Sequence, residues 1–415
     1  MINGADTAWL LISGALVLFM TPGLALFYGG MVRAKSALNM MMMSFSAIGV
    51  TTIIWVLYGY SLAFGKDHNG FIGSFSHLGL GNTLSGTFGT DGHQVPTLAF
   101  AMFQLTFAII TVALLSGAIA DRVKFSSWIV FVAAWISIVY VPVSHWVFAP
   151  GGWISNQLHA LDFAGGTVVE INSGASALAL VLVIGKRTGF KRDPMRPHNL
   201  PLVLLGAGIL WFGWFGFNGG SALTSGALAS TAVINTQIAA AAAAISWVLA
   251  ERIRDGKATT LGVASGAVAG MVAITPACGF VNPFGALVIG LLSGAVSASA
   301  VALKYKLKYD DSLDVVGVHG VSGFLGMIMI GLIATTSVNK SGGDGLLSHG
   351  GFALLKRELV ASISVALFAF FATYLIAIFI EKTYGFRSKS DDEATGLDQT
   401  YHAETAYDFS SISIR

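Results

Sequence analysis

The feature that most limits the fold of this chain is a series of apolar windows, each about 20 residues long, that recurs along almost the whole sequence. A helix of roughly 20 apolar residues is long enough to cross the hydrocarbon core of a bilayer. Since 54% of the residues are hydrophobic and only 11% are charged, a soluble fold and a disordered chain are both excluded. The sequence predicts an all-α integral membrane protein with eleven transmembrane helices, near residues 8–30, 38–64, 96–120, 125–148, 162–185, 199–217, 223–252, 259–276, 284–302, 314–335 and 353–380.

Lysine and arginine residues fall mostly in alternate loops of this predicted topology. The loops near 33–35, 122–124, 186–196, 252–257 and 304–308 hold most of them, whereas the alternate loops carry only Lys66 and Lys340, with Lys356 and Arg357 at the start of the last span. Basic residues in short loops are retained on the cytoplasmic side of a membrane. The distribution predicts a multi-pass protein of the cytoplasmic (inner) membrane, with its N-terminus outside and its C-terminus in the cytoplasm.

Ten of the predicted helices can form two inverted five-helix repeats, with the C-terminal helix added at the end, because an odd number of spans inverts the second repeat. A weak repeat in the sequence, an aspartate followed by an ionisable residue, supports this arrangement. The fifth span begins with Asp162 and carries Glu170, and the tenth begins with Asp314 and carries His319. An aspartate at a helix start is ordinarily an N-cap, which is the interpretation we give to Asp314.

Glu170 and His319 are the two ionisable residues that the predicted spans place well inside the membrane. Such residues are costly in a bilayer and usually face a partner or a cavity. One interpretation is a hydrogen-bonded pair that only links two helices. The other, which we favour, is that the pair lines a conduction path and handles protons, titrating as a unit.

Aromatic residues gather at one end of three predicted spans. A belt of aromatic rings at the membrane interface is the ordinary explanation for any single ring. Together, aromatic faces without a ring of carboxylates favour a site for a cation, held by cation–π contacts. The rings concerned are Phe103 and Phe107 on the third span, Trp146 and Phe148 at the end of the fourth, and Trp214 and Phe217 at the end of the sixth.

Other classes of protein are disfavoured by what the sequence lacks. The 23 basic and 21 acidic residues nearly balance, so there is no basic patch for nucleic acid. No phosphate-binding GxxxxGK[ST] loop occurs, and one cysteine without a His/Cys cluster predicts neither a metal site nor a cofactor. A channel, a secondary transporter or a transducer remains, and an enzyme is not expected.

Seven stretches of the chain, in order, resemble the Amt/Mep/Rh ammonium transporter family, bacterial Amt branch. The resemblance implies eleven helices in inverted halves and a homotrimer with one pore per subunit. It also implies an outer vestibule that recruits ammonium, a gate of two phenylalanines, and a hydrophobic pore with two central imidazoles. The stretches are PGLALFYGGMVRAKSALN at 22–39, AMFQLTFAIITVALLSGAIADRVKF at 101–125, LDFAGGTVVEINSG at 161–174, PHNLP at 197–201, GWFGFNGGS at 213–221, TPACGF at 275–280 and DDSLDVVGVHGVSG at 310–323.

The resemblance assigns roles residue by residue. The hydroxyl of Ser221 would accept a hydrogen bond from the recruited ion, and Asp162 would hold the vestibule in shape and favour cation entry. His319 matches the second pore imidazole. The gate would be Phe107 and Phe217, with Phe103 and Trp214 beside it.

Two positions depart from the family pattern. The vestibule tryptophan is replaced by Phe148, which keeps an aromatic face but loses the indole N–H, and Trp146 is a candidate to compensate for it. The first pore histidine is replaced by Glu170, so the proton-handling pair would be Glu170 and His319.

The resemblance predicts an ammonium transporter that conducts NH3, with or without a relayed proton. A sensor of ammonium that signals to a cytoplasmic partner with little flux is the main alternative, and a gas or water pore of the Rh type is less favoured.

Residues 1–386 would form the membrane domain and 387–415 a cytoplasmic regulatory tail. The segment 391–409 resembles the region where PII-type signal proteins dock in bacterial relatives, and a solvated, unstructured tail is the alternative.

Overall fold

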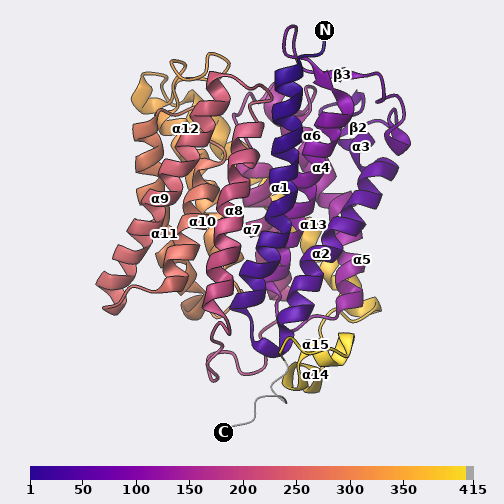
Figure 1. The fold of residues 1–415 in the computed structure, drawn as a ribbon, viewed down its shortest axis with the longest axis vertical. Helices are drawn as coiled ribbons and strands as arrows, with labels where there is room; N and C mark the ends of the chain where they lie inside the picture. The colour runs from indigo at the N-terminus through magenta and orange to yellow at the C-terminus, as the bar shows by residue number, and fades with distance from the viewer. Residues whose placement is uncertain (408–415) are drawn as a thin grey trace.

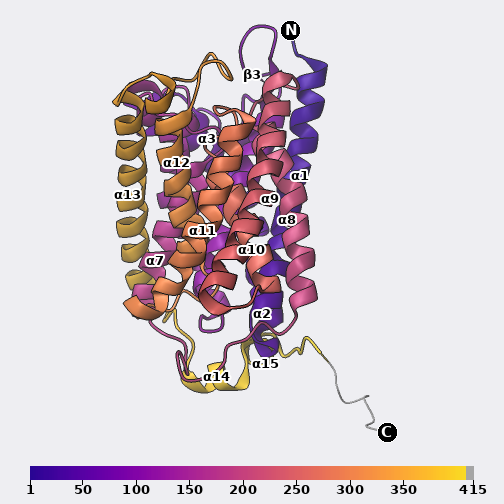
Figure 2. The same cartoon turned by 90° about the vertical axis from the view of Figure 1, so that its left-hand side faces the viewer.

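The computed structural model describes residues 1–407 as a bundle of long helices that run roughly along its longest axis (Figure 1). In this described part, ten helical segments are long and apolar enough to cross a membrane, and α10 (Thr260–Ile274) is a shorter apolar helix. The N-terminus lies at one end of the bundle, and α14 (Ser390–Thr395) and α15 (Leu397–His402) lie at the other (Figures 1 and 2). The structure therefore has the architecture of a helical membrane protein.

The connections between the spans differ in length, the longest running from Phe64 to Thr97, and several spans contain a π-helical turn. In the first half of the chain the elements are α1 (Gly4–Met31), α2 (Ala37–Ile54), η2 (Trp55–Gly59), α3 (Tyr60–Phe64), α4 (Thr97–Ala118), α5 (Phe125–Trp135), η4 (Ile136–Tyr140), α6 (Val141–Phe148), η6 (Gly166–Ile171) and α7 (Asn172–Ile184). In the second half they are α8 (Leu200–Gly220), α9 (Ala227–Asp255), α10, α11 (Pro283–Leu307), η7 (Val316–Gly320), α12 (Val321–Ile333) and α13 (Ala353–Thr383).

The loop between the second and third spans departs from the all-α prediction. It contains two antiparallel pairs of two-residue strands, β1 (Asp67–His68) with β2 (Ile72–Gly73) and β3 (Thr87–Phe88) with β4 (Val95–Pro96). These hairpins are too short to show a periodic sequence pattern, so hydropathy could not predict them.

Glycine residues, of which the chain has 50, allow the long helices to pack closely. The helices α1 and α8 lie side by side along most of their length in both views (Figures 1 and 2). A Cβ atom on Gly206 of α8 would overlap the backbone nitrogen of Phe27 on α1. This pair of helices forms one wall around the buried residues described below.

Ion pairs join the ends of the helices on the side of the bundle where α14 and α15 lie. Asp310 lies 2.8 Å from Arg187 and 3.9 Å from the fully buried Arg122, and Asp121 contacts both Arg187 and Arg33. Burial opposes ionisation of Asp310, but the hydrogen bonds from Arg187 and the charge of Arg122 outweigh it and lower the pKa of Asp310. The network fixes loops from both halves of the chain against each other.

The start of the polar tail packs against this end of the bundle. Arg387 pairs with Glu393 at 2.8 Å, and the carboxylate of Asp398 accepts two backbone N–H groups at the start of α2, at 3.0 and 2.8 Å. The alternative of a solvated, unstructured tail is therefore wrong for the described part of the tail. Residues 408–415, which include the end of the segment predicted for partner docking, lie outside the described residues.

Candidate functional site

Two π-helical turns carry the two ionisable residues predicted to lie inside the membrane. Glu170 lies in η6 and His319 in η7, and both side chains are buried, at 0% and 3% exposure. His319 Nδ1 lies 2.7 Å from Glu170 Oε2. π-helical turns occur frequently at functional sites. The presence of these two residues on such turns therefore makes this region a candidate functional site. The contact itself agrees with both interpretations of the pair, a structural link and a proton-handling site.

Glycines permit this contact. A Cβ atom on Gly174 would overlap the backbone of Gly320, and a Cβ atom on Gly323 would lie 2.9 Å from the Cβ of Glu170. The two segments can cross at this distance only because these positions lack side chains. The backbone approach brings a carboxyl and an imidazole within hydrogen-bonding distance.

The pair must share a proton between its two facing atoms. Either Nδ1–H of His319 donates to a carboxylate, or a protonated Glu170 donates to the imidazole nitrogen, because two acceptors cannot form a hydrogen bond. Glu170 Oε1 has no hydrogen-bond partner among the described residues. One carboxyl oxygen is thus free to interact with a small polar molecule beside the pair.

A narrow cavity adjoins the pair. Its volume is about 10 Å³, close to the smallest that admits one water-sized molecule. Apart from the carboxyl and the imidazole, its walls are almost entirely hydrocarbon and aromatic. The lining residues are Met20, Leu24, Phe27, Ile110, Leu114, Val169, Glu170, Leu210, Trp214, Phe217, Val268 and His319.

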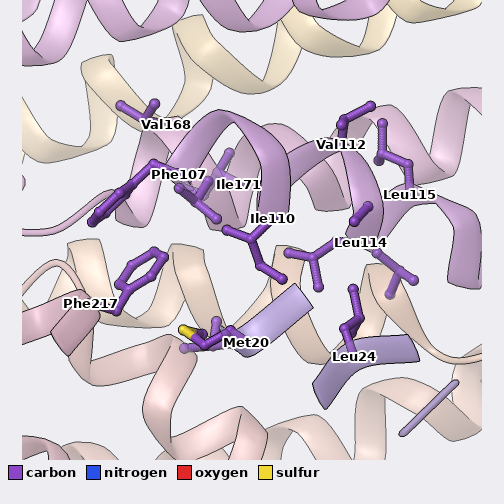
Figure 3. Close-up of a cluster of buried hydrophobic side chains, with 14 of the residues drawn as sticks. Met20, Leu24, Phe107, Ile110, Val112, Leu114, Leu115, Val168, Ile171 and Phe217 are labelled. Carbon is purple, nitrogen blue, oxygen red and sulfur yellow. The ribbon is translucent and has the colours of Figure 1, made fainter. Parts of the chain in front are cut away.

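One of the lining residues, Phe217, is stacked on a second aromatic ring, Phe107. The centroids of Phe107 and Phe217 are 4.2 Å apart, with 28° between the ring planes, and both side chains are 1% exposed. Figure 3 shows the two rings next to each other, with Ile110 and Met20 continuing the apolar wall beyond them. Phe103 lies edge-on to Phe107 at 4.8 Å, and Phe148 lies edge-on to it at 6.4 Å. Of the predicted aromatic residues, all but Trp146 thus belong to one cluster, which Trp214 joins through Phe217.

Trp214 and Ser221 adjoin this cluster at Phe217. The indole N–H of Trp214 donates to the hydroxyl of Thr275 at 2.8 Å, which fixes the ring beside Phe217. The half-buried Ser221 donates its own hydroxyl proton to the carbonyl of Phe217 at 2.8 Å. With its proton engaged, the hydroxyl oxygen of Ser221 can serve as an acceptor.

Asp162 does not line the cavity but fixes the start of η6. Its carboxylate accepts hydrogen bonds from the backbone N–H groups of Gly165, Gly166 and Thr167 at 2.7 to 2.8 Å, and from the Thr167 hydroxyl. Four donors fully engage the carboxylate. It therefore sets the backbone of the turn that carries Glu170.

The comparisons with known proteins agree with this arrangement. The Ammonium Transporter Family matches residues 8–407 of the chain. An ammonium transporter of Mycobacterium bovis is 52% identical over 99% of this chain and 92% of its own length.

The chain belongs to the Ammonium Transporter Family.

Solved structures of the family share the fold. Mep2 of Saccharomyces cerevisiae superposes with a TM-score of 0.88 at 34% identity, covering 100% of this chain and 94% of Mep2. A structure described as a sensor Amt protein superposes with a TM-score of 0.87 at 27% identity, covering 96% of this chain and 98% of its own. The resemblance inferred from the seven sequence stretches is confirmed at the level of the family.

One residue of this family member does not have the predicted role. Asp314 stands at the N-cap position, where its carbonyl accepts the N–H of Val318 at 2.8 Å, but its carboxylate pairs with Lys304 at 2.5 Å and does not cap the helix. The carboxylate that bonds back to the start of the helix is that of Asp311, which accepts the N–H of Val316 at 2.7 Å. Both aspartates precede the same apolar run, so the sequence alone did not show which one turns back onto the helix.

Trp146 does not compensate for the tryptophan that Phe148 replaces. Its indole N–H donates to the carbonyl of Phe71 at 2.8 Å, and its ring packs against Phe368 at 4.7 Å. Residues two apart on a helix point in different directions. Only Phe148 of the two rings reaches Phe107.

The sequence analysis also missed a buried carboxyl. Glu358 of α13 is 0% exposed although it follows Lys356 and Arg357. The basic neighbours made this part of the chain look like the end of a helix in contact with water. A signal was present, since α13 is long enough for Glu358 to lie more than one turn inside it.

Proposed function

We propose that this member of the family recruits NH4⁺ in an outer vestibule and conducts it as NH3 past the Phe107–Phe217 gate to Glu170 and His319. The observation that carries the proposal is the cavity between the stacked rings and the buried pair, with a volume of about 10 Å³ and largely apolar walls. It has room for a molecule the size of ammonia. The vestibule would comprise Phe103, Phe107, Phe148, Trp214, Ser221 and Asp162.

The apolar cavity favours the loss of a proton before conduction. Burial of a bare cation in hydrocarbon is far more costly than burial of a neutral polar molecule. Aromatic faces and the Ser221 oxygen would hold the ion outside the gate, each cation–π contact contributing about 0.5–2 kcal/mol. Ammonium, unlike K⁺, can then give up a proton and pass as a neutral molecule.

The Glu170–His319 pair would receive or relay that proton. A carboxylate beside an imidazole stabilises the imidazolium, and the imidazolium stabilises the carboxylate. Glu170 lines the cavity, and its Oε1, which has no hydrogen-bond partner among the described residues, is available as an acceptor. A pair of this kind binds protons differently from two neutral imidazoles.

We infer eleven spans in two inverted five-helix repeats plus α13. Asp162 and Asp311 both cap a π-helical turn, and each comes eight residues before the member of the pair that the turn carries. The glycine contacts are also reciprocal, because Gly174 packs on the segment of His319 and Gly323 packs on that of Glu170. Such exchange of equivalent contacts is expected for a pseudo-two-fold axis.

We further propose an inner-membrane location with the N-terminus outside and the C-terminus in the cytoplasm. This orientation is supported by the loop charges and by the placement of the start of α1 and of α15 at opposite ends of the bundle.

A homotrimer is supported by exposed polar side chains on α9, including Ser230 and Gln237, which a protein neighbour would cover better than lipid. A PII-type protein would dock on the cytoplasmic loops and tail. No nucleic acid, metal or cofactor is part of the proposal.

The testing experiment is electrical recording from the purified protein in a planar membrane during an ammonium pulse, combined with uptake into proteoliposomes. We expect uptake that saturates, and a current if the proton is relayed. A Phe212→Ala variant is a matched control, because this ring is exposed on the same helix as Trp214. Binding without uptake would reject transport.

That outcome would support the second candidate, an ammonium sensor. The similarity to the sensor Amt structure favours it, as does the tail that packs on the cytoplasmic ends of the helices. A sensor would bind ammonium with little flux and transmit the binding to a cytoplasmic partner.

A further inference from the structure

A buried carboxyl on α13 has no role in the pathway described above. Glu358 is fully buried, and no Lys, Arg or His lies within ion-pair distance of it among residues 1–407. Its Oε1 accepts the backbone N–H of Leu161 at 2.8 Å, and its Oε2 has no hydrogen-bond partner in the same part of the chain. An unpaired acid in this position needs an explanation.

The contact places Glu358 directly next to Asp162. The backbone N–H of Leu161 donates to Glu358 of α13. The backbone N–H of Phe163 donates to the carbonyl of Pro276 at 3.1 Å. The backbone on both sides of Asp162 is thus fixed by elements from the second half of the chain. Asp162 in turn accepts the N–H groups at the start of η6, which carries Glu170.

We propose that Glu358 is a positioning residue for Asp162, acting through its hydrogen bond to Leu161 and in its neutral, protonated form. Through Asp162 it would set the shape of the outer vestibule and the start of the turn that carries Glu170. This inference rests on the proposed transport function. It assigns to α13 a part in recruitment of the cation, although this helix contributes no residue to the gate or the cavity.

The neutral form follows from the surroundings of the carboxyl. A buried carboxylate is retained in a protein when a cation or several donors compensate for its lost hydration. Glu358 has one backbone donor, and its charged neighbours are Asp162, of the same sign, and Arg357, next to it on the helix. The role requires an acceptor oxygen of the right length rather than a negative charge.

The experiment compares two substitutions that introduce side chains of similar length to that of glutamate. Glu358→Gln keeps a carbonyl oxygen for Leu161 and removes the titratable proton, whereas Glu358→Met removes the acceptor. Ser362→Ala is the matched control, because this buried hydroxyl lies one turn further along α13 and bonds only to the carbonyl of Glu358. Ammonium uptake against concentration, with and without competing K⁺, is measured in proteoliposomes of equal protein content, together with the thermal unfolding midpoint.

We expect Glu358→Gln and Ser362→Ala to transport with a half-saturating concentration within about twofold of wild type. Glu358→Met should raise that concentration by roughly tenfold and weaken discrimination against K⁺, with a smaller change in maximal rate, as expected for an altered recruiting site. Adding it to Asp162→Asn should cause little further loss, because both act through one element. An unchanged unfolding midpoint would separate this effect from a general loss of structure.

Other outcomes would overturn the inference. If Glu358→Met transports like wild type, the hydrogen bond to Leu161 has no role in recruitment. If Glu358→Gln is as impaired as Glu358→Met, the carboxyl acts through its charge and not as an acceptor. If Glu358→Met does not fold, an unimpaired Glu358→Gln still supports the acceptor role and an impaired one rejects it. Absence of uptake by the wild-type protein would instead reject the proposed function.

Discussion

The segments that begin the fifth and tenth helices share a backbone framework and differ in chemistry. In each, an aspartate caps a π-helical turn, an ionisable residue follows eight positions later, and a glycine comes four positions after that. The framework therefore appears twice, once with a carboxyl and once with an imidazole. The equivalent residues are Asp162, Glu170 and Gly174 in one segment and Asp311, His319 and Gly323 in the other.

The two segments therefore have equivalent backbones, and the central pair is asymmetric only because its two side chains differ. One half contributes a carboxyl and the other an imidazole to the lining of the cavity, so the two halves differ in the chemistry that they present there. The caps differ as well, because Asp162 has four donors whereas Asp311 Oδ1 has no partner among the described residues. Side-chain substitutions can therefore test the chemistry without changing the framework.

The largest effect is expected from removal of the imidazole. His319→Ala leaves Glu170 buried without its partner, and breaking one side of a buried pair costs about 3–5 kcal/mol. We expect a lower thermal unfolding midpoint and loss of most ammonium uptake. Glu170→Leu combined with His319→Leu should recover much of the stability but not the uptake. Wild-type uptake by His319→Ala would show that the pair does not handle protons.

The next effect concerns the carboxyl member of the pair. Glu170→His makes the two segments alike in chemistry, and we expect it to transport with a shifted pH dependence. Glu170→Gln retains the size and one acceptor but cannot titrate, so it should impair transport more strongly than Glu170→His. Uptake or current against pH compares both with wild type. Three identical profiles would favour the interpretation of the pair as a structural link.

A smaller effect is expected outside both segments. Trp214→Leu and Ser221→Ala remove a cation–π face and an acceptor, each worth about 0.5–2 kcal/mol, which corresponds to a loss of roughly two- to thirtyfold in selection for ammonium over K⁺. The pH dependence should remain that of wild type, because the central pair is intact. Phe212→Leu, at an exposed position of the same helix, is the control for uptake in the presence of competing K⁺. Unchanged selectivity would assign both residues to the membrane interface alone.

The sequence predicted those parts of the fold that depend on long-range hydropathy and charge. Windows of apolar residues located the helices to within a few residues, and the family stretches indicated Phe107, Phe217 and His319. Hydropathy could not locate the short hairpins of the outer loop or the end of α11, which extends to Leu307 past the predicted end at 302. The reason is that lysines near a helix C-terminus are compatible with both helix and loop.

The remaining failures concern the direction of side chains. Whether Asp311 or Asp314 turns back onto the tenth helix depends on a left-handed backbone at Asp314, which no pattern of residue types specifies. Trp146 and Phe148 look interchangeable in the sequence, yet only one reaches Phe107. Glu358 was missed because its partner, Leu161, is distant in the sequence and contributes only a backbone N–H.

The smallest effect tests the difference between the two caps. Burial, followed by the charge of Asp314, raises the pKa of Asp311 to about 6, above its ordinary value of 3.8. Between these two pH values the folded chain binds a proton that the unfolded chain has released, so the free energy of unfolding falls as the pH rises through this window. Asp311→Asn keeps an acceptor for Val316 but cannot titrate. We expect it to flatten the dependence of the unfolding midpoint on pH by a few degrees, with uptake unchanged.

Asp314→Asn is the matched comparison for this last prediction. It removes the like charge that helps to raise the pKa of Asp311, and it leaves Lys304 to favour the carboxylate form of Asp311. The pH interval in which the free energy of unfolding falls should then move toward lower pH instead of disappearing. Unfolding midpoints measured from about pH 4 to 7.5 distinguish the two results, because the interval is set by the raised and the ordinary pKa. If Asp311→Asn and wild type show the same slope, Asp311 titrates normally and the caps of the two segments are equivalent in charge as well as in backbone geometry.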